Sequence, residues 1–139
     1  MLPDGIRKEN IYPPVKDAIL GVCGGRNFTD KEYLYDILDR YDEKHGISWI
    51  VSGGAKGADT FAEQYAKDRQ VRGYSVFVAQ WEKFGRPAGY VRNALIVEMA
   101  DVLMAFPTLD SKGTWDTIRK AQSKGIPTYI FLVDNGEEV

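Results

Sequence analysis

The sequence predicts an α/β protein with a Rossmann-like three-layer sandwich, in which helices flank a mainly parallel sheet of about five strands. Two observations predict this class. Short apolar runs typical of buried strands alternate with stretches of helical spacing along the chain. Glycine-bearing turns lie between strand and helix in three segments, Gly21–Arg26, Ser52–Asp59 and Lys112–Thr114. Parallel strands place such turns along one edge of the sheet, so we expect the three turns to line one crevice.

The strand-like runs are nearly all apolar, which is the pattern of strands buried on both faces. They cover residues 18–23, 48–51, 74–79, 102–106 and 128–133. Each run is followed by a stretch with apolar residues at helical spacing, except the last. This βαβ alternation predicts right-handed crossovers that place helices on both faces of the sheet.

The helix boundaries follow from capping residues. The first helix is predicted to begin with Thr29 as N-cap, with Glu32 completing a capping box, and to stop at Gly46. The second helix opens at the Gly57 turn, and the last is closed by Gly125. A further helix resumes at residue 91, after an irregular segment.

One domain preceded by an arm is expected from the 139 residues. Residues 1–16 mix charges with prolines and predict an extended N-terminal arm, and residues 17–139 form the predicted domain. The single cysteine, Cys23, excludes an internal disulfide framework and fits a reducing compartment. No apolar run approaches the roughly 18 residues of a membrane span, and no signal peptide begins the chain. We therefore expect a cytoplasmic protein without a membrane partner.

The first two turns predict phosphate-binding backbone. Gly24, Gly25 and Arg26 form either a phosphate nest with the arginine as counter-charge or a tight turn with an exposed arginine. The second turn matches neither a P-loop nor the dinucleotide fingerprint; its candidate ligand-binding residues are Gly53, Gly54, Lys56, Gly57 and Asp59. Asp59 either stabilises the helix N-terminus or binds a ribose hydroxyl, and Lys56 is interpreted as solvated rather than catalytic.

The stretch 80–90 is too long and too aromatic for a plain connector, and long ordered loops are often functional. We interpret Trp81 as an anchor to the body and leave Tyr90 open between anchoring and stacking on a base. Nearby Arg86, Arg92 and Asn93 suit the grip of a phosphate and the orientation of a sugar or base. After the fourth strand, Pro107, Gly113 and Thr114 form a third ligand-facing turn or an ordinary N-cap.

Composition excludes several classes of site. One cysteine and one histidine cannot assemble a nitrogen and sulfur metal site, and we expect no metal and no cofactor. Catalysis by Cys23 with His45 is poorly supported, because the cysteine belongs to a buried strand and the histidine to the far end of a helix. A net charge of −2 argues against a nucleic-acid partner, although a local basic cluster remains open.

The ordered set of motifs resembles a known family. Its members are Gly24–Asp30, Ser52–Asp59, Trp81–Gly89, Arg92–Asn93 and Phe106–Pro107 with Gly113–Thr114. Together they resemble the YspA/YpsA-related branch of the SLOG superfamily, over residues 18 to 131. That superfamily also includes the lonely-guy phosphoribohydrolases and the DNA-processing Smf/DprA proteins. The resemblance implies a Rossmann-like fold that binds a nucleotide or nucleotide-derived ligand across the glycine turns.

One departure bears on catalysis. Where the lonely-guy enzymes have a catalytic glutamate after the glycine-threonine turn, this sequence has Thr117, and Asp116 is the nearest acid. Direct transfer of their N-glycosidic hydrolase activity is therefore doubtful.

Three functions remain open at this stage. The first is sensing or sequestering of a nucleotide-derived small molecule, since phosphate-binding features abound without a clear acid/base pair. The second is cleavage of a nucleotide N-glycosidic bond, with Arg92 on the phosphate and Asp116 or Asp59 beside the sugar. The third is single-stranded DNA binding, against which the acidic balance argues. A homo-oligomer is plausible by analogy with the lonely-guy relatives.

Overall fold

The computed structural model describes residues 15–134 and 137–138. Five parallel strands form one sheet in the order β3-β2-β1-β4-β5. Their bounds are Ala18–Gly24 (β1), Ile47–Ser52 (β2), Tyr74–Val76 (β3), Val102–Phe106 (β4) and Thr128–Ile130 (β5). A separate antiparallel pair joins β6 (Val133–Asp134) to β7 (Glu137–Glu138). The predicted fold class is confirmed. The predicted arm, residues 1–16, lies outside the described residues except for its last two.

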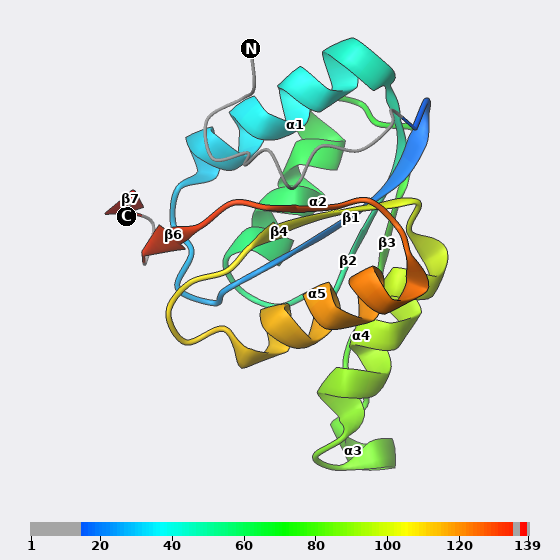
Figure 1. Ribbon diagram of the computed structural model, residues 1–139, viewed down its shortest axis with the longest axis vertical. Coiled ribbons are helices and arrows are strands. Elements are labelled where there is room, and N and C mark those ends of the chain that lie inside the picture. The colour runs from blue at the N-terminus through cyan, green and yellow to red at the C-terminus, as the bar shows by residue number, and fades with distance from the viewer. Residues whose placement is uncertain (1–14, 135–136, 139) are drawn as a thin grey trace.

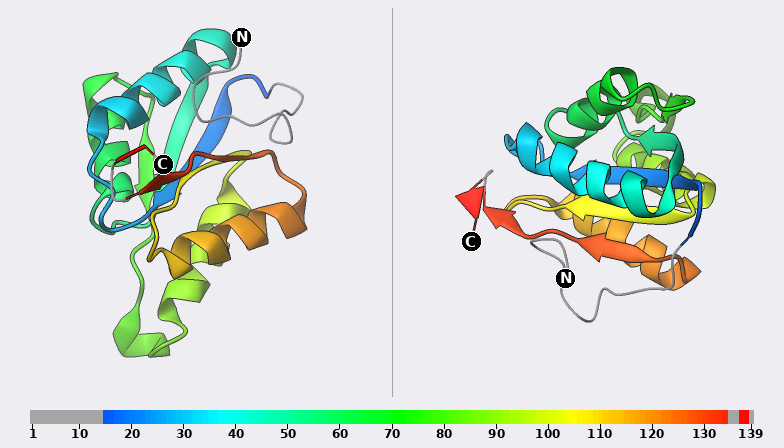
Figure 2. Two further views of the ribbon diagram at one scale, coloured as in Figure 1. Left: turned by 60° about the vertical axis from the view of Figure 1, so that its left-hand side comes forward. Right: turned by 90° about the horizontal axis from the view of Figure 1, so that it is seen from above.

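Helices cover both faces of the sheet (Figures 1 and 2). α1 (Lys31–His45) and α2 (Ala58–Asp68) lie on one face, while α4 (Ala88–Met99) and α5 (Lys112–Lys124) pack together on the other. A short helix, α3 (Trp81–Phe84), precedes α4 and projects from the body (Figure 1). Each helix connects two parallel strands, as βαβ crossovers require.

The strand β4 shows how the sequence produces these layers. All five of its residues are buried, because side chains that alternate between the two faces meet helices on both sides. Val102, Met104 and Phe106 join the core under α1 and α2. Leu103 and Ala105 join the smaller core under α4 and α5. A continuous apolar run is therefore what the central position of this strand demands.

Several boundaries differ from the predicted ones. The strands β3 and β5 end at Val76 and Ile130, each three residues before the predicted end. The N-cap of α1 is Asp30 rather than Thr29, because the Asp30 carboxylate accepts a hydrogen bond from the Tyr33 backbone N–H at 3.0 Å. The first turn of α1 thus has a side-chain cap, shifted by one residue along the chain. The segment predicted to be irregular is largely helical, since α3 starts at Trp81 and α4 at Ala88. Only the Gly85–Pro87 link interrupts the helical backbone.

Within the described part of the chain, no helix is both long enough and apolar enough to cross a membrane.

Candidate functional site

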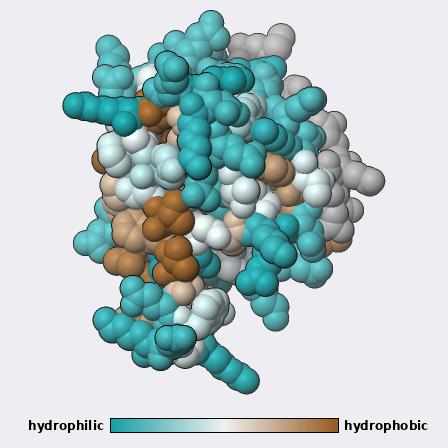
Figure 3. Space-filling model, turned by 180° about the vertical axis from the view of Figure 1, so that it is seen from behind, coloured by the Kyte–Doolittle hydropathy of each residue, from teal (hydrophilic) through white to brown (hydrophobic). Residues whose placement is uncertain are grey.

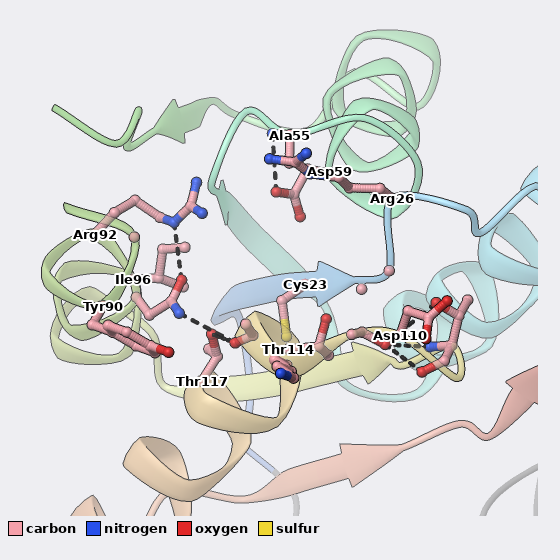
Figure 4. A pocket seen from close by; sticks show the side chains of 18 of the residues that line it. Cys23, Arg26, Ala55, Asp59, Tyr90, Arg92, Ile96, Asp110, Thr114 and Thr117 are labelled. Atoms are coloured by element: carbon pink, nitrogen blue, oxygen red, sulfur yellow. Dashed lines mark hydrogen bonds between the residues drawn. The ribbon is translucent and has the colours of Figure 1, made fainter. Parts of the chain in front are cut away.

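A pocket of about 480 Å³ opens where the carboxyl ends of β1 and β4 meet. These two strands are neighbours, but the helices that follow them, α1 and α5, lie on opposite faces of the sheet. The chain therefore diverges above this point and leaves a crevice, as at the switch point of other doubly wound sheets. Figure 4 shows side chains from the turn after β1, from α2, from α4 and from α5 converging on it.

Ten predicted ligand-binding residues line this pocket: Gly24, Gly25, Arg26, Asp59, Arg86, Tyr90, Arg92, Asn93, Gly113 and Thr114. Five others do not line it: Gly53, Gly54, Lys56, Gly57 and Pro107. Asp116, a candidate catalytic acid, is also absent from the lining. Its carboxylate forms an ion pair with the Lys120 Nζ at 2.6 Å, one turn along α5.

The first two turns use glycine mainly to pack against other protein segments. A Cβ on Gly25 would collide with the side chain of Thr108, which belongs to the loop after β4. Gly57 has a φ of 79° and a Cβ there would collide with the Gly25 carbonyl oxygen. Gly113 differs, because a Cβ built on it would meet nothing within 4 Å, and it lines the pocket. A ligand therefore has room to approach the backbone of Gly113 closely.

A chain of hydrogen bonds ties α4 to the turn after β2 and to α5. The Arg92 guanidinium donates to the Gly53 carbonyl oxygen at 2.6 Å and to the Asn93 Oδ1 at 2.9 Å. The Asn93 amide in turn donates to the Gly113 carbonyl at 3.2 Å and to the Asp116 carboxylate at 3.1 Å. The Arg-Asn pair therefore holds three segments of the site in place, and part of the donor capacity of Arg92 is already used.

Asp59 is a strongly perturbed ionisable group at the site. It is the second residue of α2 and only 5% exposed, and its Oδ2 accepts the Ala55 backbone N–H at 3.1 Å. Burial raises its pKa from an ordinary value of 3.8 to about 7, against the lowering influence of the Ala55 N–H and the Arg92 charge. Burial also raises the pKa of the neighbouring Cys23 thiol, and the charge of Asp59 adds to that effect. The thiol therefore stays protonated at neutral pH and is a poor nucleophile.

The opposite wall of the pocket is the N-terminus of α5. Its N-cap, Ser111, makes no side-chain capping bond to the helix, because its hydroxyl contacts Thr108 instead. The backbone N–H groups of the first helical turn lack intrahelical partners by geometry, and the dipole makes this end positive. Lys112, Gly113 and Thr114 of that turn line the pocket. This wall is suited to an anion.

The rim of the pocket combines cations with exposed aromatic rings. Four cationic residues line it, Arg26, Arg86, Arg92 and Lys112, against two acids, Asp59 and Asp110. Trp81 and Tyr90 also line it and are 54% and 52% exposed. The exposure of Trp81 disagrees with its interpretation as an anchor, because an anchoring ring is covered by the body. Tyr90 is held from one side by the Lys120 ammonium, 5.4 Å from its ring centroid.

Exposed apolar side chains concentrate in one stretch of the chain. Six of the nine large ones among the described residues fall between positions 74 and 95: Tyr74, Val78, Trp81, Phe84, Tyr90 and Leu95. Figure 3 shows that the rear face is mostly hydrophilic, with apolar side chains gathered just above the projecting end of the molecule. Such clustering marks an interaction region more often than scattered exposed residues do.

Sequence reasoning missed several lining residues, among them Cys23, Ala55, Ile96, Thr108, Ser111 and Thr117. Helical spacing could have found two of them. Ile96 follows Asn93 by three residues and Thr117 follows Thr114 by three, so each shares a helix face with a predicted residue. Thr108 and Ser111 carried no such signal, because their position depends on how the loop after β4 packs against Gly25. Within the described ranges, no group of His, Cys, Asp or Glu side chains is arranged to hold a metal ion.

Comparison with known proteins identifies the family. A model of the YspA, cpYpsA-related SLOG family matches residues 19–84. The Gene 61 protein of Mycobacterium phage D29 is 37% identical in an alignment over 118 residues that covers 79% of this chain and 93% of the phage protein. This chain belongs to the YspA, cpYpsA-related SLOG family. The resemblance drawn from the motif order is thereby confirmed.

This SLOG protein also resembles a solved structure of DNA processing protein A from Helicobacter pylori. The two share 20% of their residues, with a TM-score of 0.62 over 89% of this chain and 68% of the other. That structure was described for its mode of single-stranded DNA binding.

The comparison corrects two expectations. The expected ligand, a small nucleotide-derived molecule, is wrong, and so is the expectation that nucleic acid is an unlikely partner. The structural neighbour that overturns both binds single-stranded DNA. The physical reason is that a net charge does not show how the charges are distributed over the surface. The net charge of −2 sums over the whole surface, whereas the pocket has four cations against two acids, one of which has a raised pKa. A local basic cluster of this kind is invisible in a total.

Proposed function

We propose that this SLOG protein binds single-stranded DNA, with one nucleotide in the pocket and its neighbours on the rim. The observation that carries the proposal is the rim, where exposed Trp81 and Tyr90 stand among four cationic residues. Single strands are bound in this way elsewhere, by a positive groove for phosphates and by aromatic side chains on which bases stack. The likeness of the fold to a single-stranded DNA-binding protein supports the same function.

In this proposal the phosphate and the base of the nucleotide bind to different parts of the pocket. A phosphate of the strand approaches the N-terminus of α5, where Gly113 leaves room and the backbone N–H groups are free to donate. Arg26, Arg86 and Lys112 supply charge at the mouth. Tyr90 is pre-positioned by Lys120, so one ring face is occupied and the other is free to stack on a base.

The test is fluorescence anisotropy with a labelled mixed-sequence single strand of about 12 nucleotides. We expect saturable binding that weakens as salt is raised, since released counterions drive part of the affinity. A hairpin duplex of the same composition is expected to bind more weakly, because its base faces are covered. No anisotropy change at low salt with any strand, for protein verified as folded, would overturn the proposal.

Tyr90→Ala provides the sharper measurement. Loss of one stacked base is expected to weaken binding by about 5- to 150-fold, which corresponds to about 1–3 kcal/mol. The matched control is Tyr74→Ala. Tyr74 is an exposed tyrosine with Lys67 over its ring at 5.5 Å, but it lies outside the pocket. Equal losses in both variants would argue that the pocket is not where the strand binds.

A further inference from the structure

The floor of the pocket contains a carboxylate oxygen without a partner. Only 5% of Asp59 is exposed, and among the described residues its Oδ1 has no hydrogen-bond partner. Figure 4 shows this carboxylate on the α2 side of the pocket, directed at the space above Cys23. Buried polar atoms are nearly always paired, so an unpaired one at a pocket calls for a missing partner. Above its pKa of about 7 the Asp59 carboxylate is ionised and only accepts, so its missing partner there is a donor.

The surrounding protein does not supply that donor. The Arg92 guanidinium donates to Gly53 and Asn93, and the Asn93 amide donates to Gly113 and Asp116. The Ala55 N–H is bound to the other oxygen of the same carboxylate. The Gly53 N–H also lowers the pKa of Asp59, but the Oδ1 has no hydrogen-bond partner among the described residues, which leaves this oxygen to a ligand.

The charge distribution orients a nucleotide in the pocket. Asp59 lies in the first turn of α2 and Thr114 in the first turn of α5. These helices lie on opposite faces of the sheet, so the two groups face each other across the pocket (Figure 4). A phosphate is attracted by the α5 N-terminus and repelled by the Asp59 carboxylate. The base of that nucleotide therefore points its edge at Asp59.

Given the proposed DNA binding, on which this step rests, we infer that Asp59 selects a base with an exocyclic amino group. Its free carboxylate oxygen accepts a hydrogen bond from the amino group of cytosine, adenine or guanine. A carboxylate accepting from the cytosine N4 amino group is a known form of base readout. Thymine instead presents two carbonyl oxygens, which the carboxylate repels, with a single ring N–H between them. The pocket is thus a base-selective subsite within an otherwise sequence-tolerant surface.

The experiment compares oligo-dC with oligo-dT of about 12 nucleotides by anisotropy, at about pH 8 where Asp59 is ionised. Both are pyrimidines, so base size is matched. We expect tighter binding of oligo-dC by about 5- to 150-fold, the usual discrimination of a good base contact. In Asp59→Asn the preference is expected to fall toward none, because an amide both donates and accepts.

Asp36→Asn is the control. Asp36 is an exposed acid on α1 outside the pocket lining, and its loss is expected to leave the dC-to-dT ratio unchanged. Equal binding of oligo-dC and oligo-dT by the unmodified protein would overturn the inference while the proposed function stands. A ratio that persists in folded Asp59→Asn protein would also overturn it. Failure of every strand to bind would remove the proposed function and this inference together.

Discussion

The two faces of the sheet differ in what they contribute. The face under α1 and α2 buries a cluster of 18 apolar residues, whereas the face under α4 and α5 buries a cluster of six. Since hydrophobic burial dominates folding free energy, the first face supplies most of the stability. On the second face α4 and α5 provide much of the pocket lining. The difference teaches that this fold concentrates its core on one side and keeps the other available for a site.

The helix N-termini show the same division. α1 starts at a side-chain cap, where Asp30 accepts the Tyr33 N–H. α2, α4 and α5 have no side-chain cap, and a residue in the first turn of each, Asp59, Gly89 and Thr114, lines the pocket. Uncapped N–H groups are a cost to a helix by itself but are donors for a ligand.

The largest effect is expected from a cavity in the core under α1 and α2. Leu38 lies fully buried in α1, and Leu38→Ala is expected to lower the free energy of unfolding by about 2–5 kcal/mol. Urea denaturation measures this, with exposed Leu95→Ala on α4 as the control, which should cost far less. The folded fraction of Leu38→Ala should keep its DNA affinity. A loss below that of the control would contradict the assignment of the main core to this face.

The next largest effect is the pH dependence of the free energy of unfolding, which depends on Asp59 in the pocket. The Asp59 carboxyl ionises near pH 4 in the unfolded chain and near pH 7 in the folded one, so between these values only the folded state holds the proton. Stability from this group therefore falls as pH rises from about 4 to about 7, by up to roughly 4 kcal/mol, and is constant above. Asp59→Asn should remove that loss and stabilise the protein by up to roughly 4 kcal/mol at about pH 8, but only by roughly 1.5 kcal/mol at about pH 5.

Urea unfolding of both proteins at the two pH values measures this second prediction. The same difference between wild type and variant at both would show that burial does not perturb Asp59. A stabilised but less selective variant would also illustrate the frequent exchange of stability for function at binding sites.

The smallest effect concerns the cap. Asp30→Ala is expected to lower the free energy of unfolding by about 1 kcal/mol, because the Tyr33 N–H loses its acceptor. Asp36→Ala on the same helix is the control, since its exposed pair with Arg40 contributes only a few tenths of a kcal/mol. Thermal denaturation resolves the two. Neither variant should alter DNA binding, and a change in affinity for Asp30→Ala alone would place the start of α1 in the site.

Much of the fold was predictable because apolar runs and stop signals are local. β4 has the predicted bounds, since Val102–Phe106 is continuously apolar and Pro107 follows it. The strand-turn-helix logic also brought Gly25 and Gly113 to one pocket, although Gly54 lies outside its lining. Parallel topology alone places the ends of β1 and β4 side by side, and no detail of packing is needed for that.

The rest depended on interactions between distant segments. Thr29 and Asp30 are both good N-caps, and only the backbone path into α1 selects Asp30. The helical character of Trp81–Phe84 was hidden by aromatic residues that a loop would also tolerate. The unpaired oxygen of Asp59 could not be predicted either, because it results from where Arg92 and Asn93 send their donors.

The packing of Gly57 against the carbonyl of Gly25, and of Gly25 against Thr108, has a consequence for recognition. The loops after β1, β2 and β4, which surround the DNA in the proposed function, are thus already packed against one another. Little conformational entropy is then left to lose on association, so a few contacts suffice for useful affinity. We expect the free and DNA-bound proteins to differ chiefly in the side-chain rotamers at the rim of the pocket, while the backbone of the three loops stays unchanged.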